Sequence, residues 1–233
     1  RDGPAIDPVT GFFSPDAWSF WSTARDGANV AAGGAASRLP DWPDRNLYTD
    51  LASGSLTAPG NALAADNTAL TAELLRVPPE ERQAVIEWAR GRDVLDADGD
   101  GDTAEDRREM GDPLHSQPVT LSYGTDAENP RTLVFVSTND GYLHAIDAET
   151  GIERWAFVPS RLLPQLYTLY RNEPVQAKVY GLDGEMTLYV RNRDGRPGIA
   201  AGDQAILLFG MGRGGNAVFA LAVTDPAAPR QLW

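Results

Sequence analysis

The pattern of apolar and polar positions changes near residue 113. From there onward, short β-prone runs alternate with clusters of Gly, Asn and Asp, and the first four runs cover residues 119–123, 132–137, 142–146 and 152–157. Short runs bounded by such turn formers predict antiparallel strands joined by tight turns. This half of the chain is therefore expected to be mainly β.

The end of the chain echoes this first group of strands. Residues 133–136 resemble residues 206–209, and residues 145–146 resemble residues 220–221. Four antiparallel strands in about forty residues have the dimensions of one β-propeller blade. Two blades cannot close a ring. We therefore expect residues 113–233 to form the first blades of a partial β-propeller that continues beyond the chain.

One helix is clearly indicated before the strands. Pro79 suits the first helical turn, and Gly91 suits the position that ends a helix. Between them, Val85, Trp88 and Ala89 have the i, i+3, i+4 spacing of a single apolar stripe.

Weaker patterns predict three further features. A second helix is expected over residues 68–75, and a helical or irregular insertion over residues 161–170. A β-hairpin is expected through the turn at Asp183-Gly184, with strands at residues 177–180 and 185–190.

The N-terminal part of the chain, residues 1–65, has no sustained hydrophobic period. It contains many turn formers, but aromatic residues such as Trp18 and Trp42 interrupt them, so we expect an irregular segment packed on other parts of the protein. Together with the helices, it is expected to form an irregular and helical N-terminal segment over residues 1–112. The chain begins at Arg1 without an initiator Met and is expected to be a fragment of a longer protein.

Composition excludes several classes of function. The chain has 233 residues, of which 42% are hydrophobic, so it can bury a core. Its net charge is −13 and its basic residues are scattered, which argues against nucleic-acid binding and anionic membrane surfaces. It contains no Cys, which excludes disulfides and thiolate metal sites. The longest purely aliphatic or aromatic run, near residues 205–209, is far shorter than the roughly 18 residues that span a bilayer, so no direct membrane insertion is expected.

The acidic excess is concentrated in one segment. Between Asp93 and Asp112 there are nine acidic residues and two basic ones, a local net charge of −7. Within this segment, Asp96, Asp98 and Asp100 alternate with small residues. Alternating carboxylates can turn inward around one point while glycine permits the backbone to curl, and a hard cation such as calcium needs this arrangement.

Two registers of an EF-hand-like loop compete. A loop that starts at Asp96 has carboxylates at its third and fifth positions, but its twelfth position is Arg107, which cannot bind a cation. A loop that starts at Asp98 ends on Glu109, but it has Thr103 where the turn glycine belongs. A shortened EF-hand-like loop over residues 96–106 is therefore favoured, closed by Asp102, Glu105 or Asp106. The expected calcium ligands are Asp96, Asp98, Asp100, Asp102 and Asp106.

A solvated acidic turn without a metal is the alternative to this calcium site. Closely spaced carboxylates repel one another unless a cation compensates them, which favours the metal site. Magnesium is less favoured than calcium because it takes fewer protein ligands and keeps more water.

Other motifs give no support for catalysis. His115 and His144 have no Ser or Asp partner that spacing reveals, so both are expected to be packed structural residues. The glycine-rich stretch at residues 210–215 lacks the Gly-Lys-Ser/Thr ending of a phosphate-binding loop and is expected to form a turn between two strands. No enzyme activity and no catalytic residue are predicted.

Several residue strings occur in a specific order along nearly the whole chain. They include Trp18-Ser19, Gly33-Gly34, Trp88-Ala89-Arg90-Gly91, Gly111-Asp112-Pro113, Thr138-Asn139-Asp140-Gly141, Trp155-Ala156-Phe157, Tyr180-Gly181-Leu182-Asp183-Gly184 and Gly212-Arg213-Gly214-Gly215. In this order they resemble the front part of the C-terminal propeller domain of PilY-type type IV pilus biogenesis factors, a family of pilus-tip adhesins.

The resemblance implies a modified, quinoprotein-like β-propeller and a calcium-binding loop at the carboxylates named above. It also implies export through the periplasm to the bacterial cell surface, at the tip of the pilus, with minor pilins as partners. The implied roles are pilus assembly, extension and retraction, twitching motility, attachment to host or abiotic surfaces, and virulence.

Two other classes of function stay open at this point. The pattern from Asp140 to Trp155 also resembles the blade repeat of pyrroloquinoline-quinone-dependent dehydrogenases, but this repeat reports architecture and not catalysis. The third possibility is a structural scaffold in which the calcium loop only fastens the helix to the propeller.

Overall fold

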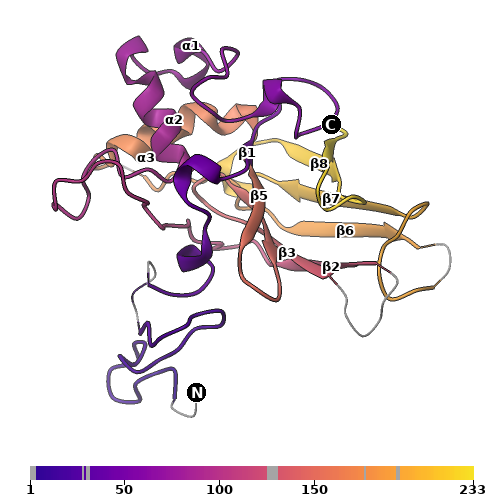
Figure 1. Cartoon of the computed structure of the whole chain (residues 1–233), viewed down its shortest axis with the longest axis horizontal. Coiled ribbons are helices and arrows are strands. Elements are labelled where there is room, and N and C mark those ends of the chain that lie inside the picture. Colours follow the sequence, from indigo (N-terminus) through magenta and orange to yellow (C-terminus); the bar gives the residue numbers. More distant parts are fainter. Residues whose placement is uncertain (1–3, 28, 30–31, 125–130, 176, 193–194) are drawn as a thin grey trace.

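The computed structural model describes residues 4–27, 29, 32–124, 131–175, 177–192 and 195–233. These residues form two β-sheets with a group of helices at one end (Figure 1). The first sheet has the strand order β1-β5-β4-β3-β2, and the second has the order β6-β7-β8-β9. The expectation of a mainly β protein is confirmed. The described residues form no closed ring, so the propeller stays a prediction.

The strands are short, and each sheet contains an antiparallel meander of four strands that follow one another in the chain. The first sheet comprises β1 (Leu47–Tyr48), β2 (Val119–Tyr123), β3 (Arg131–Ser137), β4 (Leu143–Asp147) and β5 (Glu153–Phe157). The second comprises β6 (Met186–Arg191), β7 (Gln204–Gly210), β8 (Val218–Ala222) and β9 (Arg230–Gln231). The strands predicted for the first meander are confirmed. They could be predicted from the sequence because each is bounded by turn-forming residues.

The similar sequence stretches noted above lie in equivalent strands of the two meanders. Residues 133–136 lie in β3 and residues 206–209 lie in β7, and each of these is the second strand of its meander. Residues 145–146 and 220–221 lie in the third strands, β4 and β8. The repeated pattern therefore marks a repeated structural unit.

The predicted hairpin through Asp183-Gly184 is wrong. Residues 177–180 form no strand, and β6 pairs with β7 instead. The backbone N–H groups of Asp183 and Gly184 donate to the carbonyl oxygens of Met211 and Gly210, at 3.2 and 3.1 Å. This contact with the end of β7 takes the place of the local turn that the Asp-Gly pair predicted.

Strand β1 was not predicted, and it joins the first sheet from the N-terminal segment. It lies parallel to β5, with Leu47 opposite Ala156. The carbonyl oxygen of Tyr48 accepts a hydrogen bond of 2.8 Å from the backbone N–H of Val158. The division of the chain at residue 112 stays a prediction, but the first segment contributes directly to the first sheet.

The helices are α1 (Ala72–Leu75), α2 (Arg82–Arg90) and α3 (Leu163–Arg171), and they lie together in Figure 1. A 3₁₀ turn, Pro79–Glu81, leads into α2, as the position of Pro79 predicted. The helix expected over residues 68–75 is reduced to the single turn α1. Among the described residues, no helix combines the length and the apolar composition that a bilayer crossing requires.

The two sheets pack against each other through apolar side chains. The rings of Phe157 on β5 and Phe209 on β7 meet edge to face, with their centroids 6.2 Å apart. The indole N–H of Trp155 donates to the carbonyl oxygen of Pro226 at 2.9 Å, which ties the first sheet to the β8–β9 connection. One continuous core therefore links both meanders.

The N-terminal lobe, made of the described residues 4–27, 29 and 32–45, extends beside the first sheet (Figure 1). It is irregular, as expected, and specific contacts attach it to the turn between β4 and β5. The indole N–H of Trp21 donates to the carbonyl oxygen of Ala148 at 2.9 Å. The guanidinium of Arg38 donates to the carbonyl oxygen of Thr150 at 3.2 Å.

Candidate metal centre

The acidic loop, residues 93–106, leaves the C-terminal end of α2 and returns to it. Gly91 ends the helix with a φ of 108°, a conformation that glycine adopts without strain. The backbone N–H of Asp93 donates to the carbonyl oxygen of Glu105 at 2.9 Å, and that of Arg107 donates to Gly91 at 2.6 Å. The two ends of the loop are therefore closed against each other.

The carboxylates themselves shape the turns of the loop. One oxygen each of Asp98, Asp100 and Asp102 accepts a hydrogen bond from the backbone N–H two residues further on, at 3.2, 2.8 and 2.8 Å. Gly99 and Gly101 have φ values of 78° and 91°. These successive Asx turns curl the backbone, as the alternation of Asp with small residues predicted.

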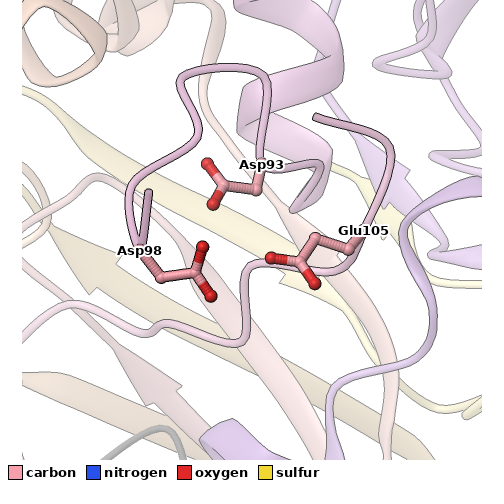
Figure 2. A group of neighbouring side chains, drawn as sticks. All are labelled: Asp93, Asp98 and Glu105. Atoms are coloured by element: carbon pink, nitrogen blue, oxygen red, sulfur yellow. The ribbon is translucent and has the colours of Figure 1, made fainter. Parts of the chain in front are cut away.

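Two groups of carboxylates converge within this loop. Asp93, Asp98 and Glu105 each offer an oxygen, and these atoms lie within 4.8 Å of one another. Asp96, Asp98 and Asp100 do the same. Figure 2 shows the first group, in which the three side chains point toward a common space. Asp98 belongs to both groups and is the centre of the arrangement.

Asp93 is the buried member of this centre. It is 4% exposed, and its Oδ2 accepts a hydrogen bond of 2.9 Å from the backbone N–H of Ala97. Its Oδ1 is buried and has no hydrogen-bond partner. A buried carboxylate oxygen without a partner is costly unless a positive charge compensates it. A cation in the space shared with Asp98 and Glu105 would supply that compensation.

The negative charge of the loop changes the pKa of Glu105. The carboxylate of Asp100 raises the pKa of Glu105 above its ordinary value, with smaller contributions from desolvation and from Asp98, Asp102 and Asp93. At Glu105, therefore, repulsion from the neighbouring carboxylates outweighs any attraction from basic groups nearby.

Two of the predicted ligands, Asp102 and Asp106, lie outside both groups. Asp106 accepts a hydrogen bond from the backbone N–H of Trp42 at 2.6 Å and forms an ion pair with Arg108 at 3.2 Å. The indole N–H of Trp42 donates to the carbonyl oxygen of Ala104 at 3.0 Å. Asp106 therefore fastens the N-terminal lobe to the loop.

The donor set fits a calcium ion. The two groups together offer five carboxylates, from Asp93, Asp96, Asp98, Asp100 and Glu105. Calcium takes about six to eight oxygen ligands in irregular geometry, whereas magnesium demands a near-ideal octahedron and keeps several waters. The unpartnered buried oxygen of Asp93 adds an observation that the acidic string alone does not provide. The identity of the ligands stays a prediction.

The expectation that His115 is packed is wrong, because its side chain is 44% exposed, and it has a partner that spacing did not reveal. Its Nδ1 lies 2.8 and 2.9 Å from the carboxylate oxygens of Asp183, which is 4% exposed. The two residues are 68 positions apart, so only the fold brings them together. In the part of the chain that the structure describes, the contacts of His115 include no Ser hydroxyl that would complete a triad.

His144 is packed, as expected, and it belongs to a buried ionic network. Its Nδ1 lies 2.5 Å from Oε2 of Glu153, and the guanidinium of Arg45 contacts both oxygens of the same carboxylate at 2.7 and 3.1 Å. Burial alone raises the pKa of Glu153, but Arg45 and His144 outweigh it and lower the pKa to about 2. The network joins the N-terminal lobe to β4 and β5.

The glycine-rich stretch at residues 210–215 forms a turn, as predicted. The 3₁₀ turn Gly212–Gly214 connects β7 directly to β8, so no helix follows it to bind a phosphate group.

Comparisons with known proteins show sequence similarity to curated proteins of the type IV pilus. No protein-family model matches the chain. Among curated relatives, the chain is similar to type IV pilus biogenesis factors. It is 33% identical to a homologue of PilY1 from Xylella fastidiosa, over 53% of this chain and 11% of that protein. It is 28% identical to PilY1 of Pseudomonas aeruginosa, over 81% of this chain and 18% of that protein.

A solved structure with sequence similarity to this chain is also of a PilY1 protein. The C-terminal domain of Pseudomonas aeruginosa PilY1 is 30% identical over 44% of this chain and 18% of that chain, with a TM-score of 0.28. This TM-score is too low to compare the two folds. The resemblance to a PilY-type type IV pilus factor, predicted from the ordered motifs, is confirmed by the sequence similarities. The chain spans less than a fifth of each of these curated relatives.

Proposed function

We propose that this chain is a calcium-binding module of a PilY-type factor that supports the assembly of type IV pili. The similarity to relatives named type IV pilus biogenesis factors, at 28% and 33% identity, supports the pilus role. In this proposal the module acts at the bacterial cell surface, after export through the periplasm. It supports extension and retraction of the pilus, twitching motility and attachment to surfaces.

The carboxylate centre of the acidic loop carries the calcium part of the proposal. The decisive observation is the buried, unpartnered Oδ1 of Asp93, whose side chain converges with those of Asp98 and Glu105. Asp96 and Asp100 complete the proposed ligand set. The bound ion would neutralise part of the charge of the loop and hold its turns in place.

The architecture proposed for the module is the beginning of a quinoprotein-like β-propeller. Two consecutive four-stranded meanders pack against each other, and the same sequence pattern recurs in their second and third strands. Trp155 supports this proposal, because its indole bonds across to the second meander, as a residue that docks neighbouring blades would.

The module is proposed to act by binding and not by catalysis. The pattern that resembles quinone-dependent dehydrogenases ends in Trp155, and the contact of this residue with Pro226 gives it a role in packing. Minor pilins at the pilus tip are the proposed partners, with host or abiotic surfaces as further targets of attachment.

Calorimetric titration with calcium tests the metal site. We expect saturable binding by the wild-type chain and none after Asp98→Asn, because Asp98 is common to both carboxylate groups. Asp225→Asn, a change at an exposed carboxylate in the connection between β8 and β9, is the matched control and should bind calcium normally. Absence of binding by the wild type would remove the calcium proposal.

The pilus role needs a test in the bacterium. Deletion of the gene should abolish twitching, and the full-length gene should restore it. Recovery of minor pilins with the tagged full-length protein should identify the partners. Normal piliation and twitching in the deletion strain would contradict the pilus role and leave the calcium result unaffected.

A further inference from the structure

A cavity of about 310 Å³ lies beside the acidic loop and shares Asp93 with the carboxylate centre. Helix α2 contributes Trp88 to its wall, helix α3 contributes Leu169 and Tyr170, and the loop contributes Asp93 and Leu95. This volume is at the lower end of the range of small-ligand pockets and suits one long side chain better than a large organic molecule.

The cavity has an excess of negative charge. Two arginines line it, but each already has an acidic partner: Arg45 contacts both oxygens of Glu153, and Arg107 pairs with Glu109. Arg45 also attracts Asp140 electrostatically, but among the described residues neither arginine forms an ion pair with Asp93 or Asp140.

Two carboxylates of the wall have only neutral hydrogen-bond donors among the described residues. Asp93 accepts from the backbone N–H of Ala97 and has an unpartnered oxygen. Asp140 accepts from the backbone N–H of Gly111 at 3.0 Å and from the hydroxyl of Thr138. Both carboxylates can accept further hydrogen bonds from a cationic group.

The rest of the wall suits an aliphatic stem. Leu95, Met110 and Leu169 supply apolar surface, and the rings of Trp88 and Tyr170 meet edge to face with centroids 5.9 Å apart. Lys and Arg side chains combine such an apolar stem with a cationic head. Cations are also attracted to aromatic faces. The guanidinium of Arg107, which lies over the ring of Trp88, is an example of such a contact in the wall of this cavity.

We propose that this cavity binds a lysine or arginine side chain of a polypeptide partner. The stem lies against the apolar wall, and the head donates to Asp93 and Asp140. The net charge of −13 favours the approach of a basic partner over long range. The proposal goes beyond calcium binding: the cavity shares Asp93 with the carboxylate centre, whereas Asp140 belongs to the cavity alone.

A pair of small probes tests the proposal on the intact chain. Nα-acetyl-arginine methylamide is the basic probe, and the citrulline analogue is its neutral isostere. Both are titrated in the presence of a calcium chelator, and binding is followed by heteronuclear NMR at the indole N–H of Trp88. We expect saturable binding of the arginine probe, about tenfold or more tighter than that of the citrulline probe.

Variants locate the charge that recognises the probe. Asp140→Asn should reduce affinity for the arginine probe about tenfold and leave that for the citrulline probe unchanged. Asp225→Asn should leave both affinities unchanged. The dispersion of the NMR spectrum reports whether each variant is folded, and Asp93→Asn provides a second test of the same prediction.

Three results would overturn the proposal: no saturable shift with the arginine probe, equal affinity for both probes, or an unchanged preference in the folded Asp140→Asn and Asp93→Asn variants. Because the titrations exclude calcium, these results are independent of whether the loop binds the ion.

Discussion

The acidic loop and the interior of the first sheet hold their charges in opposite ways. In the loop, five carboxylates gather within two overlapping groups, and one buried oxygen has no partner. In the sheet, Glu153 is equally deprived of water, but Arg45 and His144 surround its carboxylate. In the proposed function a cation from outside the chain balances the first region, whereas the second region is balanced by groups of the chain itself.

This difference distinguishes a proposed cation-binding site from a buried ionic network that stabilises the fold. A carboxylate cluster destabilises the fold when it is empty, and a bound cation removes this cost and raises the free energy of unfolding. A buried ion pair with matched geometry leaves nothing for a ligand to compensate, and it contributes mainly by fixing which segments meet. Four changes would break or sharpen this comparison.

The largest effect is expected from Glu153→Gln. The substitution leaves the buried guanidinium of Arg45 without its anion, so the free energy of unfolding should fall by about 3–5 kcal/mol in urea denaturation. Glu173→Gln is the control, because it breaks the exposed pair with Arg171, and it should cost less than about 1 kcal/mol. Equal losses of unfolding free energy in the two variants would show that the buried pair stabilises the fold no more than the exposed pair does.

The pH dependence of this network follows from the lowered pKa of Glu153. The unfolded value is 4.5 and the folded value is about 2, so the contribution is complete above 4.5 and is lost as the pH falls through 2. Acid unfolding of the wild type should therefore contain a component in this interval that Glu153→Gln lacks.

The second effect concerns calcium and the loop. At a free calcium concentration of about one hundred times its dissociation constant, the ion should raise the free energy of unfolding by about 2.7 kcal/mol. Asp98→Asn should abolish this increase, because it removes the carboxylate shared by both groups. A variant that is still stabilised by calcium to the same extent would exclude Asp98 as a ligand.

A smaller effect is expected from Asp106→Asn. The amide oxygen can still accept the hydrogen bond from Trp42, but the ion pair with Arg108 is lost, so stability should fall by about 0.5–1 kcal/mol. Calcium affinity, measured by calorimetry, should be unchanged. A loss of affinity comparable to that of Asp98→Asn would instead assign Asp106 to the metal centre.

The smallest effect, and one that changes sign, is expected from Glu105→Gln. Because Asp100 and its neighbours raise the pKa of Glu105, its charge destabilises the calcium-free fold, and this penalty fades as the pH falls through the folded pKa. The variant should melt slightly higher than the wild type in a chelator at neutral pH, and lower than it in calcium. Equal melting temperatures under both conditions would remove Glu105 from the centre.

Local sequence signals predicted local structure well. The strands of the first meander have turn formers at both ends, and the alternation of Asp with small residues produced the Asx turns of the loop. Asp96, Asp98 and Asp100 converge because neighbouring positions in such turns cannot lie far apart.

Long-range contacts explain the features that the sequence did not predict. Asp93 becomes a member of the centre because its backbone pairs with Glu105 at the end of α2. Arg45 and Glu153 are 108 residues apart, and nothing near either residue indicates the other. Residues 177–180 were expected to form a strand from a local turn signal, but β6 found its partner in β7, on its C-terminal side.

The short parallel strand β1 also affects the order of folding. It covers the outer edge of β5, and its neighbour Arg45 must find Glu153 across 108 residues of chain. Closing so long a loop is slow compared with forming adjacent hairpins. The antiparallel meander β2–β5 should therefore form first, with an open edge on β5. Until the N-terminal segment arrives, that edge is the point at which the nascent protein is most exposed to pairing with another chain.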